Sequence, residues 1–185
     1  MTDPVPAPQT HGEMHGTPDL AAVYRAHFAY AWHAARRLGV HPADLEDVVQ
    51  EVFVVVGRKL GDFDATRPLK PWLFGILYRV ALDWRRRAFR TREVPTEELR
   101  DADPSDGPER RAEQAQQRAL VARALDALEF DRRAVLVMHE FQELGVPDIA
   151  AILGIPVNTA YSRLRLARRD FAEAVKAAGA GGAHG

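Results

Sequence analysis

The chain has 185 residues, a hydrophobic content of 46% and a formal net charge of −1 at pH 7. This composition is that of a folded protein with one domain or two small ones, and the near-neutral charge argues against a protein that coats nucleic acid with its whole surface. Because the chain contains no cysteine, disulfides, thiolate metal sites and cysteine-dependent zinc fingers are excluded.

The amino-terminal segment MTDPVPAPQTHGEMHGTPD lacks the basic patch and the apolar run of a secretory signal. No stretch of the chain is long and apolar enough to cross a bilayer. We therefore expect a cytoplasmic protein with no membrane partner. Residues 1–16 are rich in Pro, Gly and small polar residues, which predicts a disordered tail, and residues 177–185 are interpreted in the same way.

Three helices are predicted between residues 17 and 92. Thr17-Pro18-Asp19 supplies the capping hydroxyl, the proline and the carboxylate of a helix start, and the apolar positions that follow at helical spacing end at Gly39. A second helix begins near Pro42. After the loop GDFDATRPLK, Pro71 opens a third helix, which runs into the basic stretch WRRRAFRTR.

Apolar periodicity stops between residues 93 and 117, where eight acidic residues face three arginines, and a flexible acidic linker is predicted there. Periodicity returns over residues 118–176, which contain a break at Asp131. No run alternates with period two over a convincing length. The predicted fold is therefore all-α, with two small helical domains at residues 17–92 and 118–176 joined by the linker.

The segment VPDIAAILGIPVNTAYSRLRLARRDF has the pattern of a helix-turn-helix. Pro147 and Asp148 suit the start of one helix, and Gly154 permits a tight turn into the next. On the second helix, apolar residues recur in steps of three and four and predict one buried stripe. Its members are Val157, Ala160, Leu164, Ala167, Phe171 and Ala174.

The opposite face of this second helix is polar. A helix in the major groove reads bases near its amino end and holds phosphates with hydroxyls and arginines at its margins. The residues predicted to contact duplex DNA are Asn158, Thr159, Tyr161, Ser162, Arg163, Arg165 and Arg168. Among them Arg165 is the candidate base reader, and Arg163 and Arg168 are candidate phosphate contacts. The alternative is an exposed helix whose arginines are merely solvated, as we expect for Arg169, or paired with Asp170 and Glu173.

Two blocks of the sequence closely resemble regions two and four of the extracytoplasmic-function sigma factors of bacterial RNA polymerase, in the sigma-70 family. The blocks are DLEDVVQEVFVVVGRKLGDFDATRPLKPWLFGILYRVALDWRRR and ALDALEFDRRAVLVMHEFQELGVPDIAAILGIPVNTAYSRLRLARRDF. The resemblance implies a subunit that binds core RNA polymerase through the β′ clamp and the β flap, melts the −10 promoter element with its first domain and reads the −35 element with its second. It also implies an anti-sigma factor as a partner, and neither a cofactor nor a metal.

The resemblance assigns further residues in the first domain. Those that match the face docking on the β′ clamp are Asp47, Gln50 and Glu51. Those expected near the −10 element are Phe63, Arg67, Lys70, Arg79, Arg85, Arg86 and Arg87, with Arg90 and Arg92 as further phosphate contacts. Phe63 would stack on an unpaired base, whereas Trp72 and Trp84 are expected in the core. A solvated helix surface would explain the polar residues without any partner.

Some positions depart from the family pattern. Tyr161 stands where relatives mostly carry Lys or Arg, and Leu166 where a second basic residue is frequent, which predicts a −35 sequence different from the commonest one. Gly57 replaces a usually bulky residue in the second helix, at a cost of about 1 kcal/mol relative to alanine if the position is exposed.

Two other functions remain open. A sigma-like decoy would bind a protein partner without DNA, and it should have lost basic residues that this recognition helix retains. A helix-turn-helix regulator would bind DNA without initiating transcription, and it would account for the second domain alone. An enzyme is not expected, because the seven histidines are scattered and no group of residues has metal-binding spacing.

Overall fold

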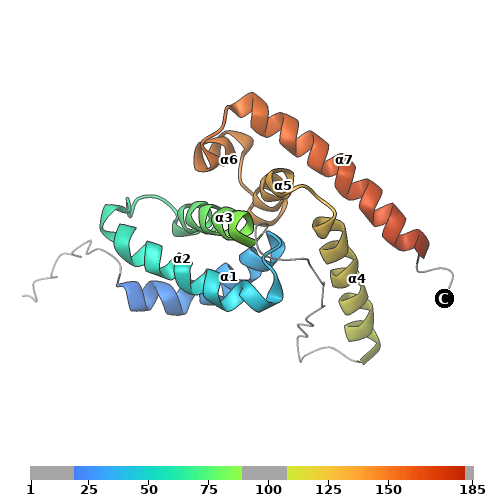
Figure 1. Cartoon of the computed structure of the whole chain (residues 1–185), viewed down its shortest axis with the longest axis horizontal. Helices are drawn as coiled ribbons and strands as arrows, with labels where there is room; N and C mark the ends of the chain where they lie inside the picture. The colour runs from blue at the N-terminus through green and yellow to red at the C-terminus, as the bar shows by residue number, and fades with distance from the viewer. Residues whose placement is uncertain (1–18, 89–107, 182–185) are drawn as a thin grey trace, which may run out of the picture.

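The computed structural model describes residues 19–88 and 108–181, and within these ranges the regular structure is entirely helical. Figure 1 shows α1, α2 and α3 on one side of the molecule and α4 to α7 on the other. The helices are α1 (Leu20–Arg37), η1 (Pro42–Asp44), α2 (Leu45–Lys59), η2 (Leu60–Asp62), α3 (Leu69–Ala88), α4 (Pro108–Asp126), α5 (Phe130–Gln142), α6 (Val146–Leu153) and α7 (Val157–Gly181). No helix in the described ranges is long and apolar enough to span a membrane.

Helix α1 begins with a carboxylate cap and ends at a glycine. The Asp19 side chain accepts hydrogen bonds from the backbone N–H groups of Ala21 and Ala22, each at 3.3 Å. Asp19, and not the hydroxyl of Thr17, is therefore the N-cap of α1; Thr17 itself lies outside the described residues. At the other end Gly39 adopts a φ of 89°, which stops the helix as predicted because this left-handed conformation favours glycine.

The first three α-helices pack together around the apolar face of α2. The six positions of this face that are buried are Leu45, Val48, Val49, Val52, Phe53 and Val56. Helix α3 begins at Leu69, two residues before the predicted start at Pro71. Trp72 and Trp84 are half-buried and pack against this core, close to where the sequence pattern places them.

Gly57 is explained by its neighbour on α1. A Cβ atom added to Gly57 would lie 2.9 Å from Cδ2 of Leu20, so the leucine side chain occupies the space that a larger residue on α2 would fill. Leu20 itself remains 41% exposed. The unusual glycine therefore leaves no hole in the packing, because α1 supplies the missing apolar volume from the other side.

The second group of helices differs from the sequence prediction at both ends. Helix α4 begins at Pro108, inside the segment 93–117 predicted as a linker. The sequence PERRAEQAQQRA opens with proline and continues with strong helix formers, but it carries too few apolar residues to show helical periodicity. Helix α7 continues to Gly181, beyond the predicted start of the tail at residue 177, in an alanine-rich stretch that favours helix.

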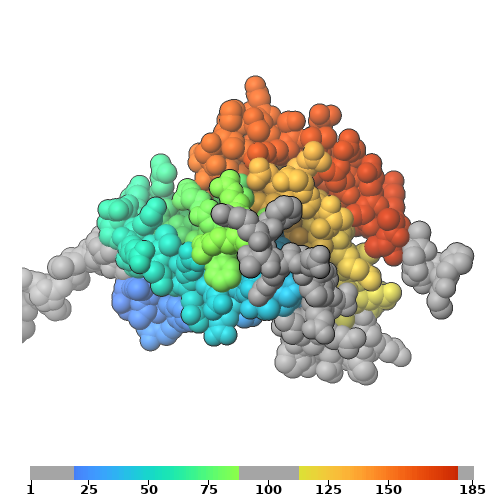
Figure 2. Space-filling model, viewed as in Figure 1, coloured from blue at the N-terminus to red at the C-terminus, as the bar shows by residue number. Residues whose placement is uncertain are grey.

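The two groups of helices touch directly. Helix α3 contacts α6, and the buried apolar residues of both groups form one continuous cluster. In Figure 2 the green surface of α3 meets the yellow and orange surface of α5 and α6. Gly75 on α3 allows the close approach, because a Cβ atom at this position would lie 3.0 Å from Cγ2 of Ile152 on α6.

Candidate nucleic-acid interface

The helix-turn-helix consists of α6, a turn and the amino-terminal part of α7. Gly154 ends α6 with a φ of 67°, which supplies the predicted tight turn. The buried stripe of α7 holds Ala160, Leu164 and Ala167 against α5 and α6. Val157, the first residue of α7, is 41% exposed, so the prediction that it belongs to the stripe is wrong and the stripe begins one turn later.

The exposed face of α7 presents several side chains that make no polar contact with any described residue. Its members at the amino end are Asn158, Tyr161, Ser162 and Arg165, and the ring of Tyr161 is 55% exposed. Thr159 is half-buried beside them. Within the described ranges, the structure therefore leaves the candidate base reader, Arg165, with its guanidinium available to a ligand.

The remaining arginines of α7 are paired with acidic side chains. Arg163 forms an ion pair of 2.6 Å with Asp131 of α5. Arg168 donates two hydrogen bonds, of 3.0 and 2.8 Å, to one carboxylate oxygen of Glu140. The Arg168–Glu140 pair is exposed, so a phosphate group could replace its carboxylate at little cost in stability, whereas the Arg163–Asp131 pair is only partly exposed.

Arg169 is paired as well as exposed. Its guanidinium donates to Asp170 at 2.8 and 3.1 Å and lies 4.0 Å from Glu173. The hydrogen bonds from Arg169, and next the one from Arg132, lower the pKa of Asp170 below its usual range. Arg169 therefore belongs to a local network of α7 and is the residue of this face least suited to read bases.

The loop before α3 carries the first group of candidate −10 residues. The ring of Phe63 packs against Trp72, with 4.8 Å between the ring centroids, and Phe63 is half-buried. The ammonium of Lys70 lies 5.7 Å from the centre of the Tyr30 ring. Arg67 is highly exposed and lies 3.7 Å from Asp64, whose pKa is lowered chiefly by a hydrogen bond from the Thr66 hydroxyl.

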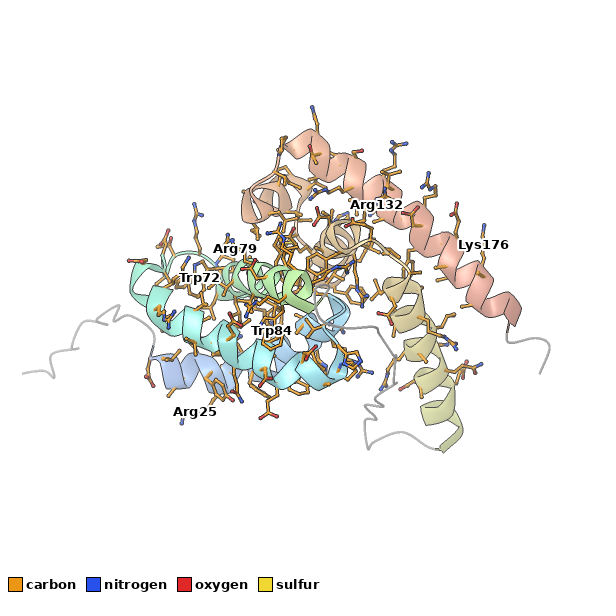
Figure 3. The ribbon with its side chains drawn as sticks, viewed as in Figure 1. Arg25, Trp72, Arg79, Trp84, Arg132 and Lys176 are labelled. Carbon is orange, nitrogen blue, oxygen red and sulfur yellow. The ribbon has the colours of Figure 1, made fainter. Side chains whose placement is uncertain are left out.

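Helix α3 carries the second group. Nη2 of Arg79 donates to the backbone carbonyl of Ile152 at 3.4 Å, and Figure 3 shows this side chain between α3 and α6. The guanidinium of Arg85 lies over the ring of Phe130 at 5.3 Å. Arg86 lies 3.9 Å from Asp83. The sites expected at Arg90 and Arg92 lie outside the described residues.

The candidate polymerase-binding residues lie on one face of α2. Asp47 and Gln50 are exposed. Glu51 is half-buried, because one of its carboxylate oxygens accepts a hydrogen bond from Nε1 of Trp84 and the other pairs with Arg87 at 3.3 Å. Glu51 therefore holds two side chains at the basic end of α3, and it also remains partly exposed.

Val54 extends the same face of α2 and is not among the predicted site residues. It lies one turn after Gln50, and its side chain is 51% exposed. An exposed valine between polar neighbours is a contact surface that costs little to cover. The available signal was its absence from the six-residue buried stripe, since a valine outside that stripe has to face solvent or a partner.

Asp131 of α5 contacts both α3 and α7. One oxygen of its carboxylate accepts a hydrogen bond of 3.0 Å from the hydroxyl of Tyr78 on α3, and the other pairs with Arg163 on α7. Burial, assisted by the negative charge of Asp131, raises the pKa of Tyr78 to about 12. The phenol therefore stays protonated and donates this hydrogen bond at neutral pH. Among the described residues, no cluster of His, Asp and Glu could hold a metal ion.

Comparison with known families accounts for both groups of helices. Residues 23–91 match the family described as Sigma-70 region 2, and residues 118–171 match the family described as Sigma-70, region 4. The first match ends within the basic stretch WRRRAFRTR. The second begins inside α4 and contains the complete helix-turn-helix.

Individual relatives are similar over most of the chain. The RNA polymerase sigma factor CnrH of Cupriavidus metallidurans is 34% identical over 147 residues, which cover 73% of this chain and 75% of the relative. The ECF RNA polymerase sigma factor SigL of Mycobacterium tuberculosis is 33% identical over 157 residues, covering 81% and 85%.

Solved structures show the same fold. A structure of CnrH in complex with the cytosolic domain of CnrY superimposes with a TM-score of 0.57 at 26% identity, covering 85% of this chain and 88% of that one. The sigma factor RpoE of Bartonella quintana, solved with the anti-sigma factor NepR, gives a TM-score of 0.66 at 21% identity and covers 84% and 96%.

The pairing of Arg168 with Glu140 predicts a gain of DNA affinity when the carboxylate is removed. In Glu140→Gln, Arg168 becomes free to neutralise a phosphate, so binding to duplex DNA of arbitrary sequence should tighten and the slope of log K against log salt should steepen by about 0.9. Fluorescence anisotropy at several salt concentrations measures both quantities. Glu173→Gln is the control, because it removes one negative charge from α7 and leaves the pair between Arg168 and Glu140 intact. Equal slopes in the two variants would contradict the expectation.

Proposed function

The chain belongs to the extracytoplasmic-function sigma factors of the sigma-70 family, and on that premise we propose which of its residues perform each step of initiation. It is an RNA polymerase sigma factor that directs promoter-specific transcription. The observation that carries this conclusion is the presence of regions 2 and 4, in that order, over residues 23–91 and 118–171. A helix-turn-helix regulator would explain only the second match.

The two domains divide the promoter between them. We assign residues 17–92 to core polymerase and the −10 element, and residues 118–176 to the −35 element. The segment between them is a tether whose carboxyl-terminal part, from Pro108, joins α4. This division is supported by the separate basic surfaces, one on the loop and α3 and the other on α7.

Duplex recognition is assigned to the exposed face of α7. Arg165 reads a base edge in the major groove, where arginine commonly donates two hydrogen bonds to guanine. Asn158, Tyr161 and Ser162 line the groove beside it. Arg163 and Arg168 exchange Asp131 and Glu140 for phosphates at the margins, and this exchange orients the helix without reading sequence.

Promoter melting is assigned to the loop and α3. The stacked rings of Phe63 and Trp72 form a surface onto which an unpaired base can stack, which offsets part of the cost of unpairing. Arg67 and Lys70 lie between these two residues in the sequence and attract the freed strand. The cations of α3, namely Arg79, Arg85, Arg86 and Arg87, bind the phosphates next to it.

Core polymerase binding is assigned to the exposed face of α2. Asp47 and Gln50 supply polar contacts to the β′ clamp, and Val54 supplies an apolar contact that is buried on binding. Glu51 takes part while keeping its contacts with Trp84 and Arg87, so it connects the polymerase-binding face to the basic end of α3.

The same assignment has three further parts. The chain performs no chemistry of its own and acts by binding. It works in the cytoplasm, where core polymerase transcribes. An anti-sigma factor is its expected antagonist, which is supported by the similarity to CnrH, a sigma factor solved in complex with the cytosolic domain of CnrY.

Run-off transcription across genomic DNA tests the proposed function directly. Purified core polymerase is supplied with this chain or without it, and the transcripts are sequenced. Discrete start sites that depend on the chain and share −10 and −35 motifs are the expected result. Identical transcripts in both reactions would favour the decoy, which binds a protein partner without initiating transcription.

Arg165→Ala should weaken recognition of the −35 element by about ten-fold or more while leaving polymerase binding unchanged, because the arginine is assigned to a base and not to the clamp. Transcription from the start sites found above, with intact and mutated −35 elements, measures the effect. Arg169→Ala is the matched control, since that side chain pairs with Asp170 and Glu173 and should change little. Normal initiation by Arg165→Ala at every promoter would show that the base-reading face is wrongly assigned.

Asp47→Ala combined with Gln50→Ala should weaken association with core polymerase by about ten-fold, because both side chains are exposed on the assigned clamp face. The double variant should bind −35 duplex as the wild type does. Glu51→Gln separates the two roles of that residue: it should reduce open-complex formation more than core binding, since it loosens Trp84 and Arg87. Unchanged capture of the β′ subunit by the double variant would remove α2 from the interface.

A further inference from the structure

The two DNA-binding domains lie face to face, joined by a shared apolar cluster and by several polar contacts. Helix α3 lies on α6 at Gly75 and Ile152, and Arg79 donates to the carbonyl of Ile152. One step along α3, Tyr78 donates to Asp131 and stacks on the ring of Phe130, with 5.5 Å between the centroids. The contact between the domains therefore includes Arg79, which is assigned to promoter DNA, and its neighbour Tyr78.

Arg133 occupies the centre of this surface. It is the one charged side chain that is buried among the described residues, at 5% exposure. Its guanidinium donates to Asp126 at 2.7 Å within its own domain. The other donors cross to the first domain, where Nη2 meets the carbonyl of Arg36 at 3.3 Å and Nε meets the carbonyl of Arg37.

The first domain presents a site shaped for this guanidinium. The last carbonyls of a helix lack partners within the helix and carry the negative end of its dipole, so the end of α1 attracts a cation. Gly39 follows these carbonyls, and a Cβ atom there would lie 2.8 Å from Nη1 of Arg133. Because this position also has a φ of 89°, glycine meets both requirements at once. Arg37 in return lies over the ring of Phe141 at 4.6 Å.

This closed arrangement is incompatible with a promoter bound at both elements. Elements centred at −10 and −35 lie about 25 base pairs apart, or about 85 Å along the duplex at about 3.4 Å per step. Helices α3 and α6 are in direct contact, and Arg79 and Arg85 are engaged by the second domain. The domains have to separate before each can reach its own element.

We propose that the free chain rests in this closed arrangement and that Arg133, inserted at the end of α1, is the latch that holds it. This inference rests on the proposed function, since it requires that both domains bind promoter DNA. Core polymerase binds the exposed face of α2, and promoter phosphates bind Arg79 and Arg85. Both partners bind the open form, in which the two domains are apart.

When the domains separate, the guanidinium of Arg133 keeps a charged partner. Asp126 belongs to the same domain as Arg133, and its side chain is 52% exposed, so the arginine keeps a carboxylate partner after the domains separate. The carbonyls of Arg36 and Arg37 become hydrated at the end of α1. The contact therefore holds the domains in one geometry and remains reversible.

Spin labels measure closure without polymerase or promoter. The cysteine-free chain allows Arg25→Cys on α1 and Lys176→Cys on α7 to be labelled specifically, and Figure 3 shows both residues pointing away from the protein on the two domains. The wild-type background should give one narrow distance distribution, and Arg133→Gln should give a broad one extending to longer distances. Arg132→Gln is the matched control, because that neighbour pairs with Asp170 inside the second domain at 2.6 Å. Equal distributions for both variants would overturn the proposal.

A disulfide across the contact tests the consequence without touching Arg133. A Cβ on Gly75 would lie 3.0 Å from Cγ2 of Ile152, and the nearest other atoms are at 3.9 Å, so the Cβ atoms of the two positions lie between 3.9 Å and about 4.5 Å apart. This separation suits a disulfide in the double variant Gly75→Cys, Ile152→Cys.

The oxidised double variant should lose at least about ten-fold in run-off transcription, and reductant should restore it. Full transcription by the oxidised chain, or failure of the disulfide to form, would overturn the latch. The absence of transcription by the wild-type chain would instead count against the proposed function, while the spin-label distances would still report closure.

Discussion

The insertion of one arginine into the carboxyl end of α1 fixes how the rest of the molecule is arranged. A guanidinium in an apolar core requires hydrogen-bond partners, and each of the three nitrogens of Arg133 finds one, on Asp126 and on two carbonyls of the other domain. Apolar packing tolerates small shifts, whereas a buried set of directional hydrogen bonds does not. With α5 placed against α1 in this way, Tyr78 meets Asp131 and α6 settles on Gly75 of α3.

The charges of the face of α7 that is assigned to DNA follow a related logic. Several arginines assigned to phosphates already have an acidic neighbour, as in Arg163 with Asp131 and Arg168 with Glu140. The Arg168–Glu140 pair is exposed and contributes little to stability, so a phosphate can take the place of its carboxylate. Arg165 stands apart among the described residues of this face because it has no such neighbour, and a base-reading side chain has nothing to exchange before it binds.

The local features of the fold follow from the sequence, and the contacts between domains do not. The stripe of α2 and the Gly154 turn depend on spacing and on backbone conformation over a few residues, which a sequence displays directly. Arg133 offers no such signal, because a charged residue on a helix ordinarily faces solvent. The amino-terminal half of α4 was hidden for the opposite reason: it has few apolar residues to display a period. The roles of the site residues depend on partners and remain predictions.

The polar character of the domain contact suits a protein that has to be stable in two arrangements. An apolar seam of the same extent would expose hydrophobic surface whenever the domains separated, and such surface promotes association between chains. At this contact the groups released on opening include a guanidinium, a phenol and a carboxylate, all of which water solvates well. Apolar groups take part as well, since Ile152 approaches Gly75, the rings of Tyr78 and Phe130 stack, and the buried apolar residues of both domains form one cluster. Because hydration offsets much of what the hydrogen bonds contribute, the closed and open forms differ modestly in free energy. A modest difference is what binding to polymerase or to DNA can overcome.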